Sequence, residues 1–265
     1  MTRHVLIAAA LAVMASAAAA ADFSVKPLVT SLASRPESVL LVGNSLLYYN
    51  CGVNECLEGI ARSKGVTLRA TLASIGGAGL DLQDVSGYLE RIRSAGNDKG
   101  AEESSGQALG FSPFDAVVLE GPVRPLKAKL FPKYARIHSG AVRDYGAGLL
   151  FLAPWAHRRH PEMTGILMDT TARAANENRG MMVPVGLAFA RSRAGRPDLR
   201  LTAGDGRHPS AAGTYLEAAV LFSVLTKSTP EGADYSGGCE KPMDRDDAAW
   251  LQRIAWETVR DYFGW

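Results

Sequence analysis

The sequence has almost no net charge and few cysteines. Its 29 lysine and arginine residues nearly balance its 27 aspartate and glutamate residues, and this balance argues against a nucleic-acid-binding protein. The three cysteines are Cys51, Cys56 and Cys239. They include no second close pair and have no histidine near them in sequence, which argues against a zinc site. We therefore expect no metal, no cofactor and no nucleic-acid partner.

The N-terminal apolar run is too short to span a bilayer comfortably. It covers residues 5–15, follows Arg3 and His4, and leads through small residues to Ala19-Ala20-Ala21. A positive start, a short apolar core and an A-x-A site are typical of a secretory signal peptide. We predict a signal peptide over residues 1–21 and a single periplasmic or secreted domain over residues 22–265, with an uncleaved anchor as the alternative. After cleavage we expect no stable membrane insertion.

An exported chain meets oxidising conditions, so its cysteines are candidates for a disulfide. Because their number is odd, one thiol must stay unpaired or pair with another molecule. Cys51 and Cys56 are the nearest pair in sequence, but pairing of either one with Cys239 is equally allowed.

Short apolar runs alternate with helical patterns along the mature chain, without a repeat or a linker. This alternation predicts an α/β fold with a parallel sheet. A polar stretch at 94–113 indicates a surface loop or an insertion. The expected strands are 39–42, 66–75, 114–119, 149–153 and 181–185. The expected helices are 53–63, 80–92, 134–145 and 163–178, a helical turn at 186–192, an amphipathic helix starting at Pro209, and a final helix from Asp244.

A serine stands where the first apolar strand ends. Gly43-Asn44 breaks the run 39–42, so Ser45 lies at the carboxyl end of a strand, the edge of an α/β sheet where ligands bind. The hydroxyl either faces that crevice or caps the next helix. Far downstream, Asp205 precedes His208 by three residues in a polar loop.

These two stretches, Gly43-Asn44-Ser45-Leu46 and Asp205-x-x-His208-Pro209-Ser210, resemble the two end blocks of the SGNH (GDSL-like) hydrolases. The resemblance implies a three-layer α/β/α, flavodoxin-like fold with a central, mostly parallel five-stranded sheet. It also implies ester hydrolysis with Ser45 as the nucleophile. A serine needs a base, and an imidazole needs its other nitrogen held, so His208 and Asp205 complete a triad. The alternatives are a histidine that caps its own helix and an ordinary turn aspartate.

The anionic intermediate of such a reaction needs hydrogen-bond donors. The backbone amide of Ser45 is one candidate for this oxyanion hole. Gly77 resembles the glycine of the family's second block, because it follows a strand and precedes a helix. Gly76, Gly77 and Gly79 could equally serve only the turn. The spacing of these glycines does not complete a dinucleotide-binding motif.

The family's third block, Gly-x-Asn-Asp, is missing. Its place after the third strand reads Glu120-Gly121-Pro122-Val123-Arg124, with no asparagine. Pro122 cannot donate a hydrogen bond. Three alternatives are open for the missing donor. Arg124 or another side chain replaces the asparagine, Glu120 reaches the oxyanion hole, or the oxyanion hole has only backbone donors. Gly96-Asn97-Asp98 imitates the missing block, but it follows a helix within a polar stretch.

Several side chains near the predicted catalytic edge are candidate substrate contacts. Trp155 follows the fourth strand, and an indole can stack on a sugar, although a solvated loop is the alternative. Tyr48 and Tyr49 are equally ambiguous. His157 and His160 could ligate a metal from a helix, but Arg158 and Arg159 between them disfavour a cation. The substrate contacts that we predict are Asn44, Glu120, Arg124 and Trp155.

The sequence therefore favours an exported serine esterase that removes acyl groups, with acetyl expected, from a carbohydrate or another small ester. A first alternative is a catalytically weak domain of this type that binds an envelope polysaccharide, which the missing asparagine supports. A second is a lipid-acting esterase or thioesterase, which would need a wider apolar groove. The sequence does not specify the oligomeric state.

Overall fold

A computed structural model describes residues 23–97, 113–123, 129–239 and 241–265. Three predictions fall wholly or partly outside these residues. They are the signal peptide at 1–21, most of the polar loop at 94–113, and the substrate contact Arg124.

The centre of the fold is a sheet of five parallel strands in the order β2-β1-β3-β4-β5. Every residue of β1 and β3 is buried, because helices cover both faces of the sheet. The predicted α/β class and the parallel sheet are confirmed. The strands are β1 (Ser38–Gly43), β2 (Arg69–Ser74), β3 (Ala116–Glu120), β4 (Gly148–Leu152) and β5 (Met181–Val183).

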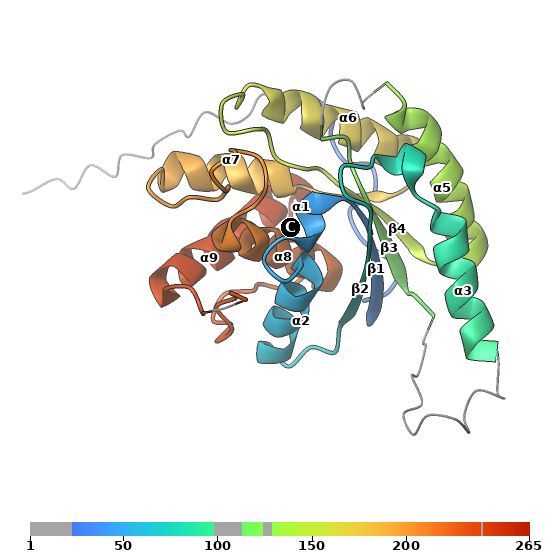
Figure 1. The fold of residues 1–265 in the computed structure, drawn as a ribbon, viewed down its shortest axis with the longest axis horizontal. Coiled ribbons are helices and arrows are strands. Elements are labelled where there is room, and N and C mark those ends of the chain that lie inside the picture. The colour runs from blue at the N-terminus through green and yellow to red at the C-terminus, as the bar shows by residue number, and fades with distance from the viewer. Residues whose placement is uncertain (1–22, 98–112, 124–128, 240) are drawn as a thin grey trace, which may run out of the picture.

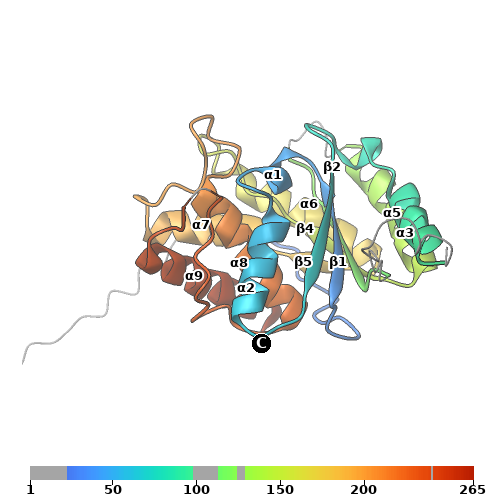
Figure 2. The same ribbon diagram turned by 60° about the horizontal axis from the view of Figure 1, so that its bottom comes forward.

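Two helical layers enclose the sheet, as Figures 1 and 2 show. One layer contains α2 (Val53–Ser63), α7 (Val185–Gly195), α8 (Ala211–Thr226) and α9 (Arg245–Phe263). The other contains α3 (Val85–Asn97), α5 (Phe131–Tyr145) and α6 (Met163–Glu177). Two short elements, α1 (Ser45–Tyr48) and η1 (Leu80–Leu82), follow β1 and β2. Among the described residues, no helix combines the length and hydropathy that a membrane span requires.

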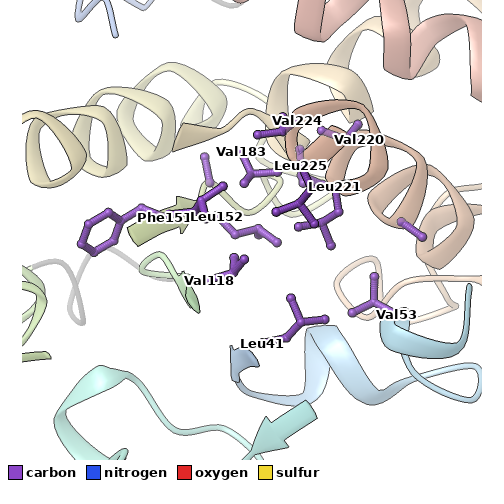
Figure 3. Close-up of a cluster of buried hydrophobic side chains, with 14 of the residues drawn as sticks. Leu41, Val53, Val118, Phe151, Leu152, Val183, Val220, Leu221, Val224 and Leu225 are labelled. Carbon is purple, nitrogen blue, oxygen red and sulfur yellow. The ribbon is translucent and has the colours of Figure 1, made fainter. Parts of the chain in front are cut away.

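Helix α8 differs from its prediction. The sequence indicated an amphipathic helix, but all side chains from Ala212 to Thr226 are buried. The reason is tertiary: α2, α7 and α9 all contact α8, and its remaining side packs toward the sheet. Figure 3 shows Val220, Leu221 and Leu225 of α8 within the central cluster of apolar side chains. The start was also misplaced, because Ser210, not Pro209, adjoins the first helical turn and caps it.

Two further helices differ from the prediction in their extent, and the ends of several other elements differ by up to three residues. The helix expected at 80–92 is divided into η1 and α3. At the break, the side-chain amide of Gln83 donates to the Gly43 carbonyl at 2.6 Å. The helical turn expected at 186–192 is a complete helix, α7, of 11 residues. The break at Gln83 therefore supports the end of β1 at Gly43, two residues before Ser45.

Cysteine pairing is one point that the sequence left open. Cys51 and Cys239 form a disulfide, and Cys56 is a buried free thiol. The disulfide joins residues 188 positions apart. It therefore fixes the segment just after α1 to the segment before α9.

Candidate active site

The site lies where the strand order reverses. β2 is on one side of β1, whereas β3, β4 and β5 follow on the other side. Connections leave the carboxyl ends of β1 and β3 in opposite directions, and such a switch point opens a crevice in parallel sheets. Asn44 and Ser45 follow β1 there, and Glu120 ends β3.

Ser45 is the first residue of α1. The alternative that Ser45 caps this helix is wrong, because Asn44 is the N-cap and its side-chain oxygen accepts a hydrogen bond from the Leu46 amide at 3.1 Å. The Ser45 hydroxyl is therefore not used in capping. It lies 2.9 Å from Nε2 of His208, across 163 positions of sequence.

The imidazole of His208 is held from its other side. Its Nδ1 lies 2.5 Å from Oδ2 of Asp205. Oδ1 of Asp205 accepts from the backbone amides of Arg207 and His208, at 2.9 and 3.1 Å. These hydrogen bonds, that from the Arg207 amide foremost, lower the pKa of Asp205 to about 2. Asp205 is therefore a turn aspartate and a carboxylate partner of the imidazole at once. His208 does not cap α8, since Ser210 does.

A tyrosine covers one face of this imidazole. The rings of Tyr49 and His208 are stacked, with centroids 4.2 Å apart and planes 9° from parallel. The ring of Tyr48 stacks with that of Tyr49, with centroids 5.7 Å apart. The sequence left the role of both tyrosines open. Because the Tyr49 ring lies flat on the imidazole, it restricts the orientation in which Nε2 faces Ser45.

Trp155 supports the histidine loop. Its ring stacks on Phe189 with centroids 4.1 Å apart, and its Nε1 donates to the Arg207 carbonyl at 2.9 Å. The indole is only 4% exposed, so one of its faces is not available for stacking on a sugar. Nε2 of His157 lies 3.0 Å from the Asp205 carbonyl oxygen and ties down the same loop.

Gly77 lies in the same hollow as Ser45 and His208. Its φ of +70° explains why a glycine is needed at this turn. Val123 also lines the hollow, shortly after β3, near the place where the third-block asparagine was expected. Gly96 and Asn97 belong to the last turn of α3. Asp98, like Arg124, lies outside the described residues.

Glu120 is completely buried beneath the turn that carries Ser45. Its Oε2 accepts the Asn44 amide at 2.7 Å, and its Oε1 has no hydrogen-bond partner among the described residues. Burial raises its pKa to about 8, against the opposing effect of the Asn44 amide. A Cβ on Gly43 would collide with this carboxyl group, so the close approach requires glycine. Glu120 thus supports the turn and lines neither of the two larger hollows described next.

Two hollows share Val123 and Arg207, and Ser45 lines one of them. The serine cleft, of about 410 Å³, is lined by Asn44, Ser45, Tyr48, Tyr49, Gly76, Gly77, Val123, Arg207 and His208. The apolar cavity, of about 450 Å³, is lined by Leu46, Val123, Trp155, His157, His160, Met163, Leu167 and Arg207. Asn44 lines the serine cleft, but its side-chain amide already donates to the Ala78 carbonyl at 3.1 Å.

Across the described parts of the chain, no three histidine, cysteine or acidic side chains come together as ligands. Nδ1 of His160 lies 3.1 Å from the Glu162 carboxylate, on the surface. The sequence reasoning missed both residues that line the two hollows, Val123 and Arg207. Arg207 stands within the Asp205–His208 block, so its position in sequence could have suggested it.

Comparison with solved structures gives the fold a context. A protein of the DUF4886 family from Bacteroides uniformis aligns over 84% of this chain and 94% of its own, with a TM-score of 0.57 and 17% identity. A protein from Slackia heliotrinireducens, proposed to be an SGNH hydrolase, aligns over 71% of this chain and 98% of its own, with a TM-score of 0.51 and 24% identity. The chain has the SGNH-hydrolase fold.

In this SGNH-hydrolase fold, the segments after β1 and before α8 meet at one edge of the sheet. No protein-family model matches the sequence, and a comparison with curated proteins found no match either.

Proposed function

We propose that this protein is an exported serine hydrolase that cleaves carboxylic esters, with Ser45 as the nucleophile. The observation that carries the proposal is the hydrogen-bonded series from Ser45 Oγ to His208 Nε2 and from His208 Nδ1 to Asp205 Oδ2. It lies in an open hollow at the switch point of the sheet. The expectation from the two end blocks and the solved structure with this fold support the same reaction class.

In the proposed reaction, Ser45 Oγ attacks the ester carbonyl carbon while its proton passes to Nε2 of His208. Asp205, ionised because its pKa is about 2, stabilises the imidazolium through Nδ1. The tetrahedral intermediate collapses, the C–O bond to the alcohol breaks, and the alcohol takes the proton from Nε2. Water then repeats these steps on the acyl-enzyme, releasing the acid and restoring the serine.

The oxyanion would be bound by the backbone amides of Ser45 and Gly77. An asparagine donor has no counterpart at Val123, and each such donor is worth on the order of 3 kcal/mol of barrier. This specific difference favours a second candidate function, a catalytically weak domain that binds an envelope polysaccharide ester. The two functions differ in whether Ser45 becomes acylated.

Export is a further part of the proposal. The predicted signal at 1–21 and the Cys51–Cys239 disulfide both fit an oxidising compartment such as the periplasm. The substrate expected there is a small ester or an acylated glycan, with no nucleic-acid partner.

The test is labelling with a fluorophosphonate, followed by peptide mapping, together with hydrolysis of p-nitrophenyl acetate. We expect the label on Ser45 and loss of hydrolysis by at least about 10⁴-fold in Ser45→Ala. Ser63→Ala, a serine at the end of α2, is the control and should keep both. Absence of labelling in the folded protein would reject the hydrolase and leave the binding domain. If Ser45→Ala lost activity and also had a much lower melting temperature, Ser45 would have a packing role instead.

A further inference from the structure

The apolar cavity is much larger than an acetyl group, and most of its walls are apolar. Among the described residues that line it, five are apolar, three are the basic His157, His160 and Arg207, and none carries a carboxylate. The apolar ones are Leu46, Val123, Trp155, Met163 and Leu167. Its volume of about 450 Å³ equals that of roughly fifteen liquid water molecules. A single methyl group would leave most of this space filled with water, against apolar walls.

The cavity also borders the serine cleft, because Val123 and Arg207 line both. Ser45 and His208 line only the serine cleft, whereas Leu46 and Arg207, their neighbours in sequence, line the apolar cavity. His208 must return its proton to the leaving alcohol, so the alcohol departs on the side of the serine cleft. An acyl group on Ser45 has room to extend past Val123, which lines both hollows, into the apolar cavity.

We propose that this cavity binds a medium-length apolar acyl chain, so that the preferred substrates are esters of such acids and not acetyl esters. The inference rests on the proposed function and narrows its substrate class. The sequence analysis noted that a lipid-acting esterase would need a wide apolar groove. The volume and lining of this cavity meet that requirement. Burial of each added methylene against Leu167, Met163 and Trp155 should strengthen transition-state binding until the cavity is full.

The experiment measures kcat/KM for p-nitrophenyl acetate, butyrate, hexanoate and octanoate with the full-length protein. A buried methylene is worth about fourfold in kcat/KM, so we expect a rise of at least tenfold from acetate to hexanoate. Met163→Trp, which fills the cavity from the start of α6, should lower the octanoate-to-acetate ratio at least tenfold. Ile166→Trp, three residues along the same helix but 54% exposed, is the matched control and should keep the ratio.

A second measurement does not depend on turnover. Sodium octanoate should raise the melting temperature of Ser45→Ala more than sodium acetate does, and Met163→Trp in that background should abolish the difference. A rate that is highest for acetate, with equal effects of both salts on Ser45→Ala, would overturn the acyl-chain proposal while leaving the hydrolase intact. Failure of Ser45 to react with the fluorophosphonate, with octanoate still bound, would instead reject the proposed function.

Discussion

Glu120 provides a direct test of the electrostatics beneath the nucleophile. In the unfolded chain a glutamate ionises near pH 4.5, whereas burial raises the pKa of Glu120 to about 8 in the folded protein. Between these pH values Glu120 is ionised in the unfolded chain but still protonated in the folded protein. The contribution of Glu120 to the free energy of unfolding is therefore fully present below pH 4.5 and is lost as the pH rises through 8. Each pH unit costs about 1.4 kcal/mol, and the full loss is on the order of 5 kcal/mol.

Glu120→Gln removes this proton while keeping an oxygen for the Asn44 amide. We expect a constant cost of about 1–3 kcal/mol, because the new amide group is a buried donor without a partner. On top of this cost, the variant should become more stable relative to the wild type by several kcal/mol between pH 5 and pH 9. The change of this free-energy difference with pH tests the raised pKa of Glu120, whereas the constant cost does not.

The assay is urea unfolding at pH 5, 6, 7, 8 and 9, followed by the fluorescence of the four tryptophans. The difference between variant and wild type is compared at each pH, because the buried Glu217 also has a raised pKa, through burial first and then through repulsion from Glu120. Glu120→Gln removes that repulsion, so the pKa of Glu217 should fall in the variant, which changes the difference in the same direction as the loss of Glu120 itself. Glu177→Gln, on the exposed end of α6, is the control and should show a constant difference. If the free-energy difference for Glu120→Gln were the same at pH 5 and pH 9, the reasoning from burial would be refuted.

Two further predictions follow from contacts around the site. Tyr49→Leu removes the ring stacked on His208 and should lower kcat/KM for ester hydrolysis by about 2- to 10-fold, the effect expected for an aromatic pair. Tyr49→Phe keeps the ring and should lower kcat/KM less. Equal losses in the two variants would contradict a stacking role for Tyr49. The Cys51–Cys239 disulfide closes a loop of 188 residues, worth about 5 kcal/mol by chain entropy. A reductant should therefore lower the urea midpoint of the wild type and not of Cys51→Ala, and equal responses would argue against this pairing.

Local sequence patterns were enough to predict the architecture. The apolar runs around Leu41 and Val118 are buried on both faces, and uninterrupted runs of this kind form strands of parallel sheets. The glycine and proline positions marked most element ends correctly to within a few residues. The blocks around Ser45 and His208 indicated two segments at one edge of the sheet, although their chemical roles remain predictions.

Other features depended on neighbours that no local pattern describes. The period of apolar residues shows which side of a helix is apolar, but not how many elements surround it, so α8 was expected to be amphipathic and is buried all round. The three possible disulfides were equal in sequence, and only the positions of Cys51 and Cys239 in space distinguish them. The buried state of Glu120 depends on the close approach of β1 through Gly43.

The sequence by itself determined the order of strands and helices and the kinds of side chain at the carboxyl edge, because both follow from local periodicity and turn residues. Only the tertiary structure decided that Ser45 and His208 lie 2.9 Å apart, that Tyr49 covers the imidazole, and that residues after β3 and β4 enclose an apolar cavity. The physical reason is that such contacts join residues distant in sequence, and their geometry is set by the packing of the whole sheet and its helices.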